Sequence, residues 1–271
     1  MRSIAETNSC RCRFLRVACV SVGLSTLACG SVDFGQRATG QPDAPGADVC
    51  RTDAQAHGPM LVQCHYAARA LQSKDSAMVT LNKPLSDGDL WIATVADSDG
   101  LPTADNLTPG DWSFAYASTE DAGAGTFYRA VTHGLQEPVE LSSIGGGTGD
   151  EDDLRLVVME WSGLVTDSDP KDVATGTGSA RRGTGGMTAE ISLTTTNAND
   201  LVLLDVSSDG IIGDPPSSQG WTKIDPLIIA SPASQERIWW RIAPAAGWVE
   251  GSVPVGGAGW DAVIAAFKTA P

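Results

Sequence analysis

The sequence predicts an all-β fold: a two-layer antiparallel β-sandwich, jelly-roll-like and built from two similar halves. Three observations predict it. Thirty glycines and fifteen prolines in 271 residues favour short strands joined by turns over long helices. Short apolar runs recur between these turns, as expected for buried strands. The same series of strands and turns also occurs twice along the chain.

The repeat rests on landmarks that follow one another in the same order in both halves. Their sequences are DLWIATVADSDG (89–100) and DLVLLDVSSDG (200–210), turns ending at Trp112 and Trp221, FYRAV (127–131) and WWRIA (239–243), and LRLVVMEW (154–161) and WDAVIAAF (260–267). We therefore expect one sandwich at 63–271, with half one at 65–166 and half two at 172–271.

Alternation along the strands predicts which side chains face inward. Both faces of the 200–206 strand are apolar, which indicates a strand covered on both sides. In the strand at 237–243, period-2 alternation predicts that Trp240 faces inward. It predicts that Arg237, Trp239 and Arg241 face outward. We expect neither half to bury its apolar face alone, so the two sets of strands close on each other as two layers. The alternative is two separate small domains.

The N-terminal segment has the pattern of a secretory signal. Four arginines precede the apolar run at 17–28, and a small residue stands before Cys29. This run is shorter than the roughly 20 residues that span a bilayer. The ending TLAC (26–29) resembles the lipobox of bacterial lipoproteins, and this resemblance implies lipidation of Cys29. We expect a signal peptide at 1–28 and a flexible tether at 29–62, because residues 29–62 are rich in Gly, Pro, Asp and Ala. The alternative is an ordinary cleaved signal without lipid.

The cysteines left after such processing favour a disulfide. Cys50 and Cys64 form an even pair in an oxidising compartment. Their bond would close a loop worth about 3 kcal/mol in the loop-entropy picture. A metal site that also uses His57 and His65 is the rival interpretation, but the C-x-x-C spacing typical of zinc sites is missing.

The charge of the chain narrows the classes of partner. The formal net charge is −15, so the surface repels phosphate backbones and we expect no nucleic-acid partner. Clustered acids suggest calcium, with Asp97 and Asp99 as candidate ligands. The sequence DSDG is also typical of a tight turn, and SSDG in half two keeps the turn while losing one carboxylate. The turn interpretation is therefore favoured, and no other cofactor is expected.

No catalytic motif marks the sequence as an enzyme. It contains no G-x-S-x-G and no H-E-x-x-H, and only three histidines, of which His133 is the one around which a triad from distant residues remains conceivable. Glu160 is a candidate acid for glycoside hydrolysis because it lies in an apolar strand. The simpler interpretation is that it faces solvent or pairs with a residue such as Arg155.

Tryptophan is the residue type that suggests a ligand. Trp112 and Trp221 recur at one position of the repeat, which favours core packing, as does the match of Trp240 with Tyr128. An outward Trp239 flanked by Arg237 and Arg241, together with Trp248 in a loop or edge, forms a candidate surface for stacking on sugar rings. Packing of Trp239 against its flanking arginines is the alternative.

The run EWSGLVTDSDPKDVATGTG (160–178), followed by TAEISLTTTNANDLVLLDV (188–206) and GWT (220–222), resembles a module of secreted bacterial proteins and of phage tail or fibre proteins. The resemblance covers about residues 65–270. It implies a jelly-roll, concanavalin-like sandwich and no fixed catalytic residues. The turn PGDW at 109–112 departs from the P-x-G-W of that pattern.

These observations favour a non-enzymatic module for binding or adhesion at the bacterial cell surface, with a glycan or a protein as its partner. The chain would be exported and held at the envelope, at the outer membrane or cell surface, by its lipid, or else secreted. The first alternative is a secreted glycan-active hydrolase or lyase on the same scaffold. The second is a structural component of the envelope or of an appendage.

The lipid anchor is directly testable by mass spectrometry of the mature protein. We expect the chain to begin at Cys29 and to carry a lipid mass, because a diacylated cysteine is the product of lipoprotein processing. A Cys29→Ser variant should lack that mass and leave the membrane fraction. An unmodified mature N-terminus at another residue would contradict the prediction.

Overall fold

A computed structural model of the chain describes residues 58–71, 76–97, 102–117, 123–132, 137–142, 152–172, 180–183, 186–231, 234–257 and 259–271. The chain divides into two units, Met1–Pro42 and Asp43–Pro271. Every described residue belongs to the second unit. The predicted signal peptide, Cys29 and most of the tether therefore lie outside the described residues.

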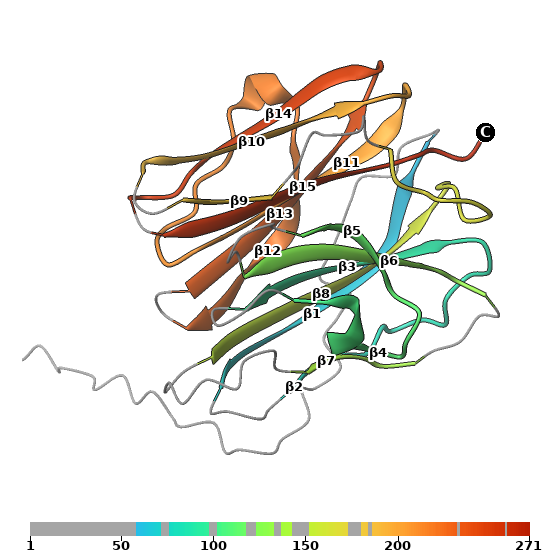
Figure 1. Ribbon diagram of the computed structural model, residues 1–271, viewed down its shortest axis with the longest axis horizontal. Coiled ribbons are helices and arrows are strands. Elements are labelled where there is room, and N and C mark those ends of the chain that lie inside the picture. Colours follow the sequence, from blue (N-terminus) through green and yellow to red (C-terminus); the bar gives the residue numbers. More distant parts are fainter. Residues whose placement is uncertain are drawn as a thin grey trace, which may run out of the picture. The chain divides into compact units, whose positions relative to one another are not determined.

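The described residues form fifteen β-strands and two single-turn 3-10 helices (Figure 1). In half one they are β1 (Met60–Leu71), β2 (Ser76–Val79), β3 (Leu90–Asp97), η1 (Ala104–Asn106), β4 (Leu107–Thr108), β5 (Ser113–Ala117), β6 (Ala124–Ala130), β7 (Val139–Ser142) and β8 (Asp152–Ser162). In half two they are β9 (Ala180–Gly183), β10 (Thr188–Thr195), β11 (Asp200–Ser208), η2 (Ser217–Gln219), β12 (Thr222–Ser231), β13 (Ser234–Ala243), β14 (Gly247–Pro254) and β15 (Trp260–Phe267).

The strands form four antiparallel sheets, two in each half. Half one has a large sheet in the order β1-β8-β3-β6-β5 and a small sheet in the order β2-β7-β4. Half two has a large sheet that reads β9-β15-β11-β13-β12 from its opposite edge, and the small sheet β10-β14. The two large sheets thus have the same topology, strand for strand. The all-β sandwich of two similar halves is confirmed, and the strand order within each half is that of a jelly roll.

The match extends to single residues in the turn before the third strand of each half. Gly88 has φ +86° and its N–H donates to the carbonyl of Val131; Asn199 has φ +66° and its N–H donates to the carbonyl of Ala243. A positive φ is open to glycine and, among other residues, mainly to Asn and Asp. The sequence therefore uses Gly in one half and Asn in the other to make the same turn.

Buried side chains fill three interfaces between the sheets. The two large sheets face each other across a core shared by both halves, in which Leu90, Trp161, Leu203, Trp240 and Phe267 are buried. The expected common interior is thus present, and β11 is buried along its whole length as the sequence predicted.

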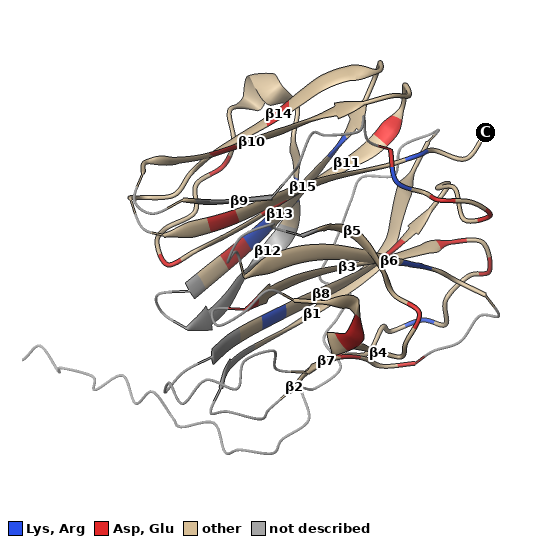
Figure 2. Ribbon diagram, in the orientation of Figure 1, with Lys and Arg blue, Asp and Glu red and all other residues tan. Residues whose placement is uncertain are grey.

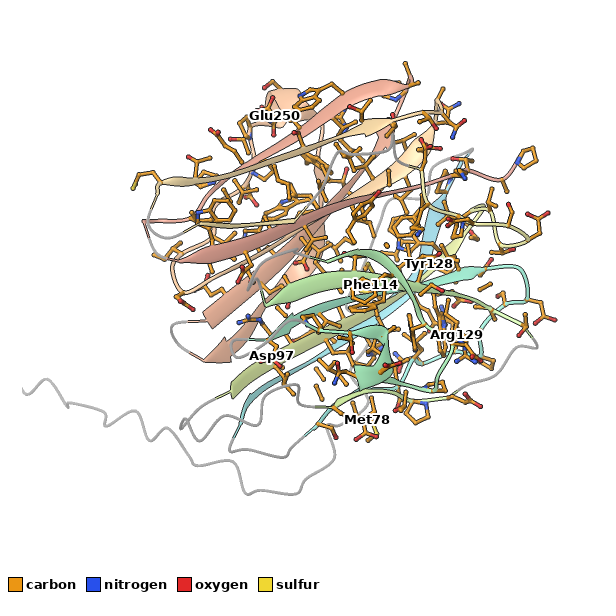
Figure 3. The ribbon with its side chains drawn as sticks, viewed as in Figure 1. Met78, Asp97, Phe114, Tyr128, Arg129 and Glu250 are labelled. Carbon is orange, nitrogen blue, oxygen red and sulfur yellow. The ribbon has the colours of Figure 1, made fainter. Side chains whose placement is uncertain are left out.

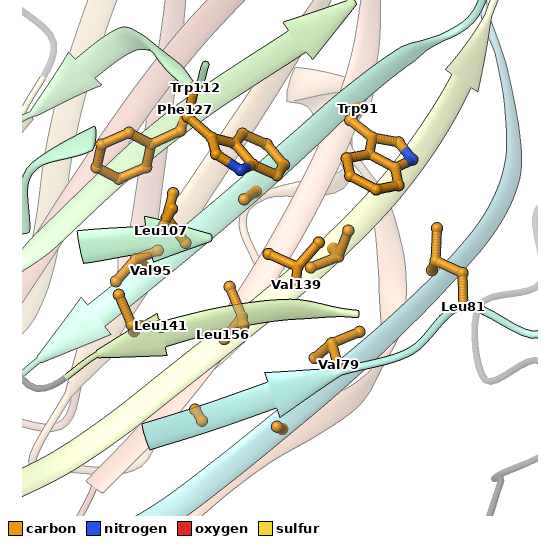
Figure 4. Close-up of a cluster of buried hydrophobic side chains, with 14 of the residues drawn as sticks. Val79, Leu81, Trp91, Val95, Leu107, Trp112, Phe127, Val139, Leu141 and Leu156 are labelled. Atoms are coloured by element: carbon orange, nitrogen blue, oxygen red, sulfur yellow. The ribbon is translucent and has the colours of Figure 1, made fainter. Parts of the chain in front are cut away.

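Each half also has an interior of its own, so the structure adds an outer layer on each side to the two layers expected. In half one the small sheet packs Leu107, Val139 and Leu141 against Trp91 and Leu156 of the large sheet (Figure 4). In half two β10 and β14 cover the outer face of the other large sheet with residues such as Leu193, Val249 and Val253. The expectation that neither half buries an apolar face alone missed these small sheets, because their strands are short or half polar.

Few charged residues lie on the strands of the two large sheets, which are mostly tan in Figure 2. Several of those present are buried, and one group of them lies at one end of the shared core. Arg155 of β8 lies across from Glu236 of β13, with Nε 3.5 Å from Oε2, and the Thr94 hydroxyl of β3 donates to the same carboxylate at 3.3 Å. The shared core is therefore apolar along most of its length and ionic at one end.

The contact between Trp161 of half one and Trp240 of half two should contribute strongly to the stability of the shared core. Their ring centroids lie 5.6 Å apart, edge to face, and both side chains are buried. Replacing Trp240 by alanine leaves a cavity between the halves, so we expect a loss of about 3–5 kcal/mol in the free energy of unfolding. Chemical denaturation measures it. Trp248→Ala, at an exposed position, is the matched control, expected within about 0.5 kcal/mol of the parent. Equal stability of both variants would contradict the shared core.

Candidate functional site

Trp239 does not form the exposed binding surface that its sequence position suggested. The alternation is as expected, since Trp239 and Trp240 lie on opposite faces of β13. However, β13 lies between β11 and β12 in the large sheet, and the small sheet covers its outer face. Trp239 is 1% exposed. The prediction that it faces solvent is therefore wrong, because alternation tells which residues share a face but not whether another layer covers that face.

The two flanking arginines are half-buried and already engaged. The Arg237 guanidinium lies 3.1 Å from a carboxylate oxygen of Asp214. The Arg241 guanidinium donates to the carbonyl of Gln219 at 2.5 Å and lies 5.5 Å from the ring centroid of Trp221. Both arginines thus hold the loops at 214–221 against the sheet. They are not assembled with Trp239 into one surface.

Trp248 is the member of the predicted set that reaches solvent. It lies on β14 and is 65% exposed. Register places Thr194 of β10 directly across from it, and Ser192 across from Glu250, so hydroxyls and a carboxylate share its face. Figure 3 labels Glu250 on the same strand. The outer face of this hairpin is therefore a flat polar surface with one exposed indole.

Contacts along the edge of β14 hold this surface in place. The Trp221 indole N–H donates to the carbonyl of Glu250 at 3.2 Å, and the backbone N–H of Ser252 donates to the Gln219 side chain at 3.3 Å. Inward residues of both strands pack into the core of half two. A side chain mounted on such a support loses little freedom when a ligand binds.

Two further pairs of acids were not foreseen, and they occupy related places in the two halves. Asp89 immediately precedes β3, and Asp200 is the first residue of β11. Asp89 shares a hydrogen bond with Glu160, and Asp200 shares one with Asp172. The sequence held a signal for them: an aspartate before the same leucine of an apolar strand in each half.

The second acid of each pair holds the turn before the strand. Glu160 accepts hydrogen bonds from the backbone N–H of Ser86 at 2.7 Å and from the Gln63 side chain at 2.5 Å. Asp172 accepts from the backbone N–H groups of Thr196 and Asn197, at 2.6 and 3.0 Å. The simpler interpretation, that Glu160 faces solvent or pairs with a residue such as Arg155, is therefore wrong. Glu160 is a buried capping group.

Burial and the shared proton set the acidity of these groups. Burial, then the Glu160 carboxylate, raises the pKa of Asp89 to about 6. Burial, then the hydrogen bond with Asp172, raises the pKa of Asp200 to about 8. Burial by itself would raise the pKa of Asp172, but the hydrogen bonds it accepts from Asp200, Thr196 and Asn197 outweigh that effect and lower it. At neutral pH the Asp172–Asp200 pair therefore holds one proton.

A third acid pair lies in the ionic end of the shared core. Burial, then the neighbouring Glu236, raises the pKa of Asp205 well above its ordinary value. Burial also raises the pKa of Glu236, although Arg155 acts in the opposite direction. Hydrolysis of a glycosidic bond needs two acids about 5–10 Å apart with sugar between them. The three pairs described here are in direct contact and buried, so their geometry suits proton sharing and structure.

The described part of the chain offers little support for a metal centre. Asp97 ends β3 and is 1% exposed, while Asp99 lies outside the described residues. Within the described ranges, no three His, Cys, Asp or Glu side chains are grouped to hold an ion. Calcium binding by Asp97 and Asp99 stays a prediction.

Other predicted positions can be placed only in part. Cys64 is buried in the shared core, but Cys50 lies outside the described residues, as does His133, so the Cys50–Cys64 disulfide stays a prediction. Trp112 packs in the core of half one as expected, stacked on Trp91 with centroids 5.7 Å apart. Of the described segments, no helix has the length and apolar character to cross a bilayer.

We compared the chain with protein families, curated proteins and solved structures. No protein-family model, no curated protein and no solved structure matches this chain.

The raised pKa of Asp200 predicts that stability falls as the pH rises from about 4 to about 8. In this window the unfolded chain has released the Asp200 proton and the folded protein retains it, so unfolding releases a proton. The contribution is complete below the ordinary pKa and lost as the pH passes about 8. Asp200→Asn cannot ionise, so its unfolding free energy should vary less across the window. Urea denaturation over the pH range measures this, with the exposed Asp105→Asn as control. Identical slopes for Asp200→Asn and the parent would contradict it.

Proposed function

We propose that this protein is a non-enzymatic module that recognises a glycan at the bacterial cell surface. The N-terminal signal pattern and Cys29 support export and a lipid anchor at the envelope. The acidic balance of the chain, with a net charge of −15, disfavours anionic polymers. A neutral sugar is therefore the favoured ligand.

One observation carries the proposal: the exposed Trp248 on the outer face of the β10–β14 hairpin. An indole ring packs against the C–H face of a sugar, because that face is apolar while the hydroxyls point outward. Thr194 lies directly across from Trp248, and Ser192 and Glu250 form the next pair along the hairpin. These groups supply donors and acceptors for the sugar hydroxyls.

The arrangement of the acids favours binding over hydrolysis. The three described acid pairs are buried and in contact, and each has a structural role in capping a turn or in the shared core. The exposed acids of the Trp248 face, Glu190 and Glu250, lie on a hairpin surface together with an exposed aromatic ring, an arrangement typical of a binding surface.

A glycan array with the parent and Trp248→Ala tests the proposal. We expect the parent to bind one or more neutral glycans and the variant to bind them at least about tenfold more weakly, which corresponds to 1.4 kcal/mol of binding energy. Ile211→Ala is the matched control, because Ile211 is also an exposed apolar side chain of half two and lies outside β10 and β14. Equal binding by the parent and Trp248→Ala would overturn the proposal, as would binding by neither.

A further inference from the structure

Half one has a groove that is separate from the Trp248 surface. It encloses about 300 Å³ beside the end of β6 and the segment that joins the two halves. Its apolar lining consists of Leu90, Ala130 and Pro170. Polar residues make up the larger part of the lining: Arg129, an acid described below, and the five residues that supply hydroxyls, Ser113, Tyr128, Thr132, Thr166 and Ser168. Convergent polar groups beside a small apolar patch suit a ligand that carries both hydroxyls and C–H groups.

The wall formed by the joining segment is held firmly to half two. Leu164 and Lys171 form isolated β-bridges with Thr269 and Phe267. The backbone N–H of Val165 donates to the carbonyl of Lys268 at 3.0 Å, and the N–H of Lys268 donates to that of Pro170 at 2.7 Å. The groove is thus bounded by two fixed elements, and its shape is set before a ligand arrives.

Tyr128 is the most constrained side chain of the lining. Its hydroxyl donates to Asp169 at 3.1 Å, its ring meets Phe267 edge to face at 6.1 Å, and the Lys171 ammonium lies 5.9 Å from the ring centroid. Burial, then the Asp169 charge, raises the pKa of Tyr128, so the phenol stays protonated at neutral pH. Its oxygen can still accept a hydrogen bond from a ligand.

Asp111 supplies the carboxylate of the groove. It is exposed and has φ +73°, a left-handed conformation that few residues other than Gly, Asn and Asp adopt. Among the described residues no hydrogen bond or ion pair engages its side chain. A carboxylate with both oxygens available accepts hydrogen bonds from two neighbouring hydroxyls of one ligand.

The groove lies beside a position at which the two halves of the repeat differ. The landmarks FYRAV and WWRIA align Tyr128 with Trp240. Trp240 is buried against Trp161 in the shared core, whereas Tyr128 is only half-buried. Where half two fills the space with an indole, half one leaves an opening lined with hydroxyls. A polar opening at a position where two otherwise similar halves differ is a candidate site for binding a ligand.

We propose that this groove binds one neutral sugar residue, as a free monosaccharide or as the end of a chain. The inference rests on the proposed glycan function and adds a site separate from Trp248. The apolar side chains of the lining receive the C–H face of the ring, Asp111 accepts from two adjacent hydroxyls, and Ser113, Thr132 and Thr166 complete the hydrogen bonds. A single sugar ring fits a volume of about 300 Å³. Arg129 also lines the groove, but its guanidinium lies over the Trp91 ring at 5.7 Å, so an anionic sugar would meet the Asp111 carboxylate.

The test is a titration of glucose, galactose, mannose and N-acetylglucosamine followed by saturation-transfer NMR and calorimetry. We expect at least one of them to bind the parent. Asp111→Gly should weaken that binding at least tenfold while it keeps the left-handed backbone, since glycine adopts this conformation freely. Thr166→Val removes a groove hydroxyl at nearly constant shape and should weaken binding by a smaller factor. Thermal unfolding establishes that each variant is folded.

Two controls separate this site from the Trp248 surface. Asp105→Gly removes an exposed carboxylate of half one outside the groove and should bind as the parent does. Trp248→Ala should also leave monosaccharide binding unchanged. Binding of none of the four sugars, or binding unaffected by both groove variants, overturns the groove proposal. If the array signal depends on Trp248 at the same time, the proposed function stands without it.

Discussion

The contact between the two large sheets is the constraint on which the rest of the structure depends. It places Leu90, Trp161 and their neighbours from half one against Leu203, Trp240 and Phe267 from half two. Because the strands of both sheets also face a small sheet, nearly every residue of β3, β11 and β15 is buried on one side or the other. The outer faces of the small sheets are then open to solvent, and the exposed Trp248 on the β10–β14 hairpin is the clearest case.

The apolar character of this contact also determines what its few polar groups can do. An acid placed in such an interior loses its hydration, and the structure compensates by pairing it with a second acid that shares its proton. Asp89 with Glu160 and Asp200 with Asp172 use this arrangement to hold the turns that start the central strands. Glu160, the carboxylate that suggested catalysis in the sequence, is thereby part of the framework.

Much of the fold followed from the sequence, because turn residues and apolar runs repeat in register. The strands near 90–97, 200–208 and 260–267 were predicted nearly to their ends. The outer layers were not, since the alternating pattern of β10 and β14 does not say which sheet they cover. Trp239 was misplaced for the same reason. The groove was beyond sequence reasoning, because it needs Tyr128 and the segment around Thr166 to meet in space.

The ionic end of the shared core bears on which surfaces can associate. At equivalent places of the repeat, half one has Thr94 and Arg155 where half two has Asp205 and Asp261. Two copies of half two from different molecules would bring Asp205 and Glu236 of one against Asp205 and Glu236 of the other without Arg155 between them, which is a costly encounter in a desolvated interface. The pairing of Arg155 with Glu236 therefore favours association of the two large sheets within one chain over association of two half-two sheets from different molecules.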